Sequence, residues 1–255
     1  MSVPPKDAPV SATLTARLAH PCFPQPPDPE VKVWRYMSLP KLISLIRSNE
    51  LQLIRLDNFT DPYEGSTTAR TAAGIDAFLK QMSPPGGYHE MFDIYRKNRK
   101  SMFVSCWHAN EHESEAMWRL YGASDGGIAI QSTYAKLVES IAEQPDLYIG
   151  LVSYADYRTA SFPDANVFYP VMHKRLSFAH EREVRLVRMS VAPQDGETPA
   201  MLVLPWNVEA YCENVYVDPY APAYYFEALR AVLETMAPPL LPRLQWSQMK
   251  ADPVF

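Results

Sequence analysis

The chain has 255 residues, of which 47% are hydrophobic and 21% charged, a balance typical of folded globular proteins. Its formal charge of −5 argues against general nucleic-acid binding, and its 9 glycines argue against a glycine-rich phosphate loop. Its 3 cysteines contain no C-x-x-C pair, which excludes a disulfide framework and a cysteine-rich zinc module.

The sequence shows no sign of membrane insertion or secretion. No apolar run approaches the ~18 residues that a membrane helix needs, and the beginning of the chain lacks the regions of a signal peptide. We therefore expect a soluble, cytoplasmic protein without membrane contacts.

The first segment, residues 1–30, contains eight prolines. Proline removes backbone donors and favours extended geometry, so we expect a tail or a strap over the surface. We place no chemistry in it and assign residues 31–255 to one domain.

The first elements of this domain follow from residue patterns. Ser38 and Pro40 form a helix start, and Leu42, Leu45 and Ile46 give that helix an apolar face. Asp61-Pro62-Tyr63-Glu64-Gly65 has the chemistry of a turn. The expected order is a strand over 31–37, a helix over 41–49, a strand over 51–54 and the turn at 61–65.

The remaining elements alternate irregularly. We expect helices at 70–100 (broken at 84–87), 113–121, 134–143 and 223–236, and strands at 102–107, 128–130, 147–154, 183–189, 201–204, 214–217 and 244–246, with a turn at 125–127. Because no steady βαβ rhythm emerges, the pattern favours an α+β fold: a mixed, mainly antiparallel sheet with flanking helices in a single domain.

The segment from Ala179 to Val187 is the first candidate site. It reads as a strand that opens with Glu181 and Glu183, which share one face with Arg185. Two carboxylates about 7 Å apart need a cation, a hydrogen bond or open water. We expect them to face a hollow that receives a cationic centre.

Several spaced motifs resemble a widespread bacterial family of unknown function. They are Asp61-Pro62-Tyr63-Glu64, Ser105-Cys106-Trp107, Met117-Trp118-Arg119-Leu120-Tyr121, Gly127-Ile128-Ala129-Ile130, and Lys174 with Phe178 and Glu181-Arg182-Glu183-Val184-Arg185. The match covers residues 31–250. Thr60 and Phe178 stand where the family usually has Asn and Trp. The resemblance implies a bacterial protein and a shared fold.

A second pattern is similar to ADP-ribosyltransferases, which carry an Arg or His on their first strand, a Ser on a middle strand and a Glu that opens a later strand, often as E-x-E. Arg35, Ser105 and the E-x-E pair have that order. The resemblance implies a transferase with NAD as co-substrate, and so a small-molecule nucleotide as partner. Arg35 would hold a phosphate and Ser105 would support the pocket. Glu183 would be catalytic, since a carboxylate stabilises the positive charge that forms on ribose, and Glu181 would serve the acceptor.

Aromatic residues complete this hypothesis. Tyr36 or Trp107 could stack on the nicotinamide ring. No metal is expected.

Other interpretations stay open. A non-catalytic module could use the E-x-E strand and the 61–64 turn to bind a cationic peptide or a small ligand. A surface ion pair between Glu183 and Arg185 would explain both residues without catalysis. Lys174 and Arg175 could bind phosphate or form a solvated loop, and Asp61 could merely cap its turn.

The remaining motifs favour structural roles. His108-Ala109-Asn110-Glu111-His112 spells the H-x-x-E-H zinc motif, but we expect His108 to end a strand and Asn110 to cap the next helix, so that the imidazoles diverge. A zinc hydrolase is the least favoured function. We expect Cys106 to be a buried small hydrophobe, and Met117 and Tyr121 to pack in the core. The basic run at 96–100 reads as a solvated helix end.

Overall fold

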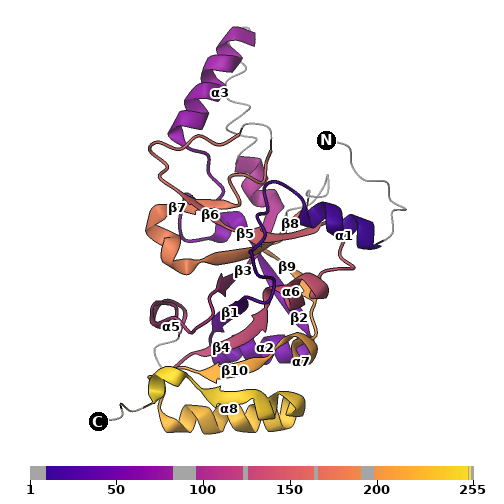
Figure 1. Cartoon of the computed structure of the whole chain (residues 1–255), viewed down its shortest axis with the longest axis vertical. Coiled ribbons are helices and arrows are strands. Elements are labelled where there is room, and N and C mark those ends of the chain that lie inside the picture. Colours follow the sequence, from indigo (N-terminus) through magenta and orange to yellow (C-terminus); the bar gives the residue numbers. More distant parts are fainter. Residues whose placement is uncertain are drawn as a thin grey trace. The chain divides into compact units, whose positions relative to one another are not determined.

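The computed structural model describes residues 10–82, 96–122, 126–163, 166–190, 198–251 and 253 (Figure 1). The predicted α+β class is confirmed, with a mixed, mostly antiparallel sheet and flanking helices. The chain forms two compact units. Unit 1 comprises Met1–Pro26, Gln52–Cys106 and Gln144–Leu202, and unit 2 comprises Pro27–Leu51, Trp107–Glu143 and Val203–Phe255.

The sheet of unit 2 is built around β1 (Lys32–Met37). β1 pairs antiparallel with β4 (Ile128–Thr133), and its Trp34 faces His108 at the end of β3 (Met102–Ala109). β10 (Asn214–Val217) extends β4 antiparallel, and β11 (Leu244–Trp246) joins β10 in parallel.

Helices supply the rest of unit 2. They are α2 (Leu39–Ser48), α5 (Glu115–Tyr121), α6 (Tyr134–Ser140), α7 (Val208–Tyr211) and α8 (Ala223–Met236), with short 3-10 helices at Pro238–Arg243 and Gln248–Lys250. The predicted apolar face of α2 is confirmed, because Leu42, Leu45 and Ile46 are buried. Ser38 is the N-cap residue, but its carbonyl rather than its side chain accepts the first helical bonds.

The strands of unit 1 are arranged around the first part of β3. β2 (Glu50–Arg55) pairs antiparallel with β3, β8 (Glu183–Met189) pairs with β3, and β5 (Leu147–Leu151) pairs antiparallel with β8. β6 (Ser153–Ala155) and β7 (His173–Arg175) form a separate parallel ribbon. β9 (Met201–Pro205), whose residues from Val203 onward belong to unit 2, follows β2 in the strand order. The helices are α1 (Val10–Leu18) and α3 (Ala69–Met82), with 3-10 helices at Leu56–Asn58 (η1) and Leu176–Glu181 (η2).

The described beginning of the chain, from Val10, is packed and is not a free tail, which leaves the strap of the two predicted alternatives. Residues from Val10 form α1, and Phe23 is 1% exposed within an apolar cluster of unit 1. Its ring stacks on Tyr148 of β5 at a centroid distance of 5.0 Å. The Pro24 carbonyl accepts a 2.8 Å bond from the N–H of Leu151. The segment is therefore packed against β5.

Most predicted elements agree with the structure to within a few residues. The strands 183–189, 214–217 and 244–246 and the helix 223–236 have the predicted bounds. The helix predicted over 70–100 is observed as α3, residues 83–95 lie outside the described part, and residues 96–101 are helical. Residue 125 of the predicted turn at 125–127 also lies outside the described part of the chain. The sequence did not predict α1, β7 or α7.

Replacing Gly150 by Ala tests the packing of the N-terminal segment on β5. An added Cβ would lie 2.7 Å from the backbone of Phe23, so we expect the free energy of unfolding to fall by about 1–3 kcal/mol, measured by urea denaturation. Gly74→Ala is the matched control, because nothing lies within 4 Å of its Cβ; it should be neutral or stabilising by up to about 1 kcal/mol. Equal effects would mean that the segment does not pack on β5.

Candidate functional site

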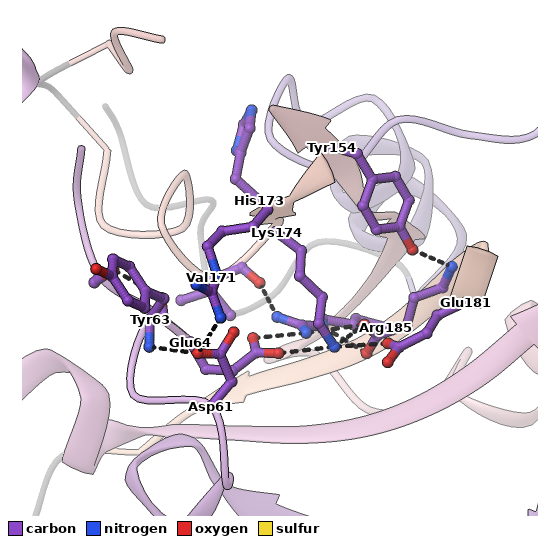
Figure 2. Close-up of polar contacts among 12 residues, drawn as sticks. Asp61, Tyr63, Glu64, Tyr154, Val171, His173, Lys174, Glu181 and Arg185 are labelled. Atoms are coloured by element: carbon purple, nitrogen blue, oxygen red, sulfur yellow. Dashed lines mark hydrogen bonds and ion pairs between the residues drawn. The ribbon is translucent and has the colours of Figure 1, made fainter. Parts of the chain in front are cut away.

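Five ionisable side chains of unit 1 form a single buried group, which we call the ionic cluster. They are Glu64, Lys174, Glu181, Glu183 and Arg185, and each is buried, Arg185 completely (Figure 2). A buried charge is costly unless it is paired and hydrogen-bonded. The cluster is consequently the part of unit 1 whose chemistry most needs an explanation.

Two short strand pairings place the cations. In the β6–β7 ribbon Lys174 lies opposite Tyr154, and in the β5–β8 pair Arg185 lies opposite Gly150. Glu183 and Arg185 are two residues apart in β8, so they share a face, as predicted. Glu64 enters from the Asp61 turn itself, where its N–H donates to the Asp61 carbonyl at 3.1 Å.

Glu181 reaches the cluster in a different way from the one predicted. It ends the 3-10 helix η2, and Arg182 then adopts a left-handed conformation with φ of 41° before β8 begins at Glu183. The prediction that one strand carries both glutamates is therefore wrong. The left-handed residue turns the backbone, and both carboxylates come to the same ammonium group.

Lys174 is the hub of the three glutamates. Its Nζ lies 2.6 Å from Glu181, 2.9 Å from Glu64 and 3.5 Å from Glu183 (Figure 2). The contact with Glu181 is a hydrogen bond, whereas those with Glu64 and Glu183 are ion pairs. Because Lys174 is only 8% exposed, its interpretation as part of a solvated loop is wrong.

Arg185 binds two of these three glutamates, Glu183 and Glu64. Its Nε and Nη2 donate to the two oxygens of Glu183 at 2.7 and 2.9 Å, and Nη2 also donates to Glu64 at 2.8 Å. Its Nη1 donates to the Val171 carbonyl at 2.5 Å. The expected pair between Glu183 and Arg185 is present, but it is buried and not at the surface.

The protonation states follow from these contacts. Burial disfavours the charged form of Glu183, but the Arg185 and Lys174 charges outweigh it and hold the pKa of Glu183 below its ordinary value. Burial also opposes the charged forms of Lys174 and Arg185, yet the glutamates raise the pKa of both. Both cations therefore stay charged at neutral pH.

The outer side of the cluster combines ion pairing with aromatic rings. Asp61 accepts bonds from the N–H of Tyr63 at 3.1 Å and from Arg175 at 3.0 Å, so it both caps its turn and pairs with a cation. The Arg175 guanidinium lies 4.3 Å from the ring centroid of Tyr63 and 5.3 Å from that of Phe178. Lys174 lies 4.7 Å from the Phe178 ring as well.

The two predicted residues of β3 in unit 1 face opposite ways. Burial, together with the nearby Glu183 carboxylate, raises the pKa of the Cys106 thiol well above its ordinary value, so it is not a ready nucleophile. Ser105, the neighbouring residue, points to the other face. Its Oγ is buried and has no hydrogen-bond partner in the described part of the chain. The structure does not bring Ser105 to Glu183.

The predicted cofactor residues Arg35, Tyr36 and Trp107 belong to unit 2. The Arg35 guanidinium lies 5.7 Å from the ring centroid of Trp107. The Tyr36 hydroxyl accepts the N–H of Ser114, and its ring packs edge-on against Trp118 in an apolar cluster that also holds Met117. Tyr36 and Met117 are thus core residues, whereas Tyr121 is exposed rather than packed in the core as expected.

The H-x-x-E-H segment does not form a helix. His108 lies in β3, as expected, whereas Ser114 rather than Asn110 caps α5 by accepting the N–H of Met117. Across the residues with described positions, no group of three His, Cys, Asp or Glu side chains could hold a metal ion.

Sequence reasoning missed two contributors to the cluster. The Tyr154 hydroxyl accepts the N–H of Glu183 at 2.8 Å, and the Val171 carbonyl accepts the bond from Arg185. A tyrosine at the end of a predicted strand is only a weak sign of a site residue. A backbone carbonyl such as that of Val171 leaves no sign in the sequence.

No family model, no curated protein and no solved structure matches this chain. Both family resemblances therefore stay predictions. Of the helices in the described segments, none is long and apolar enough to cross a bilayer.

The lowered pKa of Glu183 predicts a pH dependence of stability. Unfolded, the carboxyl has its ordinary pKa near 4.5 and binds its proton before the folded form does. The Glu183 contribution is therefore complete above that pH and is lost as the pH falls through the folded pKa. Denaturation from neutral pH to pH ~3 should show a steeper loss than in Glu183→Gln, by up to about 1.4 kcal/mol per pH unit. Parallel profiles would show that Glu183 does not titrate as described.

Proposed function

We propose that the protein is a ligand-binding module whose ionic cluster receives a small cationic ligand. The observation that carries the proposal is the charge count: three glutamates face one lysine and one arginine, which leaves a formal charge of −1 among five buried groups. Unlike charges in a partly buried setting attract several times more strongly than in water. A bound cation would neutralise the excess.

The direction of approach follows from exposure. Within the cluster the side chains of Lys174 and Glu181 are 9% and 8% exposed, against 1% for Glu64 and 0% for Arg185. Glu183 has both oxygens on Arg185. Glu181 is thus the carboxylate best placed to meet a ligand, beside the Phe178 ring that already lies against Lys174.

A second candidate is an ADP-ribosyltransferase-like enzyme that uses NAD. The charge excess favours this too, because cleavage of the nicotinamide bond creates positive charge on the ribose, which carboxylates stabilise. Glu183 would be the catalytic residue and Glu181 would act on the acceptor. This candidate ranks second because both carboxylate oxygens of Glu183 already accept hydrogen bonds from Arg185.

Choline and its uncharged isostere, in which carbon replaces nitrogen, test the first proposal. We expect choline to bind and the isostere to bind at least about tenfold more weakly, a difference of ~1.4 kcal/mol in calorimetry. Glu181→Gln removes the excess charge and should abolish the preference, while Glu139→Gln, a surface change on α6, should keep it. Equal binding of both compounds, or an unchanged preference in Glu181→Gln, would contradict the proposal.

Nicotinamide release from NAD distinguishes the two candidates. The enzyme would release nicotinamide, and Glu183→Gln would stop the release without unfolding the protein. If choline binds and no nicotinamide is released, the binding module is the one candidate that remains.

A further inference from the structure

β9 (Met201–Pro205) ends the order of strands in its sheet, with β2 as its neighbour in the described chain. The N–H of Arg55 donates to the Ala200 carbonyl at 3.0 Å, and that of Trp206 donates to Asn49 at 2.7 Å. As the chain advances from Asn49 to Arg55, the bonded partners go back from Trp206 to Ala200. The strands β2 and β9 are therefore antiparallel.

This register decides which backbone groups of β9 point outward. In an antiparallel pair, alternate residues direct their N–H and C=O groups to opposite sides. Because Ala200 and Trp206 bond toward β2, the groups of Met201, Val203 and Pro205 point away from it. Proline has no N–H, so the outward donors are those of Met201 and Val203.

The side chains of this edge are apolar and uncharged. Met201 is 37% and Val203 is 43% exposed, while Leu204 is buried. Natural edge strands usually carry lysines, bulges or prolines that block pairing with another chain. Of these features, the five residues of β9 contain one proline, Pro205, which is the last residue of the strand.

We propose that two copies of the chain pair through β9 in antiparallel fashion about a two-fold axis at Val203. Each Val203 N–H then donates to the Val203 carbonyl of the second copy, and each Met201 N–H donates to the Pro205 carbonyl opposite. Every outward donor is satisfied, and the missing N–H of Pro205 is not needed.

The chemistry of the strand identifies a second copy as the occupant. With no charge on β9, an antiparallel copy meets no repulsion, and the exposed methyl and thioether groups cover one another. The interface is small, so association depends on concentration. The inference does not depend on the proposed ligand.

Sedimentation of the full chain over a wide concentration range tests this pairing. We expect a monomer–dimer equilibrium, which Val203→Lys weakens by about tenfold or more because two lysines then face each other. Leu176→Lys is the control, since Leu176 is an exposed apolar residue of η2 at 56% and lies outside β9. It should leave the equilibrium unchanged.

Hydrogen exchange supplies a measurement without mutation. The Met201 and Val203 amides should become protected as the wild-type concentration rises. A monomer at all concentrations, an unchanged dimer in Val203→Lys, or amides whose exchange is independent of concentration would overturn the proposal.

Discussion

Burial of the Arg185 guanidinium is the constraint on which unit 1 depends. A completely buried charge has to find all its partners in the protein, and these come from distant parts of the chain: Glu64, 121 residues earlier, Val171, and Glu183 on its own strand. Lys174 is also buried and pairs with the same two glutamates, Glu64 and Glu183. The two cations thus fix where the loop after Asp61, the β7 strand and the start of β8 lie.

The same constraint limits what the glutamates can do. A carboxylate held by two nitrogens of a buried guanidinium, as Glu183 is, is a poor partner for a substrate, because a ligand would have to break a buried pair. Glu181 pairs with Lys174, whereas Glu183 is held by the guanidinium, and the Glu181 side chain is 8% exposed. A chemical role for the cluster is therefore better sought at Glu181 and in the excess negative charge than in the set of Arg35, Ser105 and Glu183.

The parts of the fold that follow local patterns could be predicted from the sequence. β8, β10 and α8 have the expected bounds because their apolar periodicity is continuous. The face shared by Glu183 and Arg185 follows from strand alternation. The turn after Glu181 could not be predicted, since a left-handed arginine has no sequence signal. The packing of Phe23 and the pairing of Lys174 with Glu64 depend on contacts between segments far apart in the chain.

The most direct test of this account is the free energy of unfolding of Arg185→Met, with Arg158→Met as control. Arg158 forms an ion pair with Asp156, but its side chain is 88% exposed. Removal of Arg185 takes from Glu64 and Glu183 one of the two buried cations that they share, and we expect a loss of about 3–5 kcal/mol. The control should lose no more than about 0.5 kcal/mol. Similar small losses in both variants would contradict the claim that the cluster holds unit 1 together.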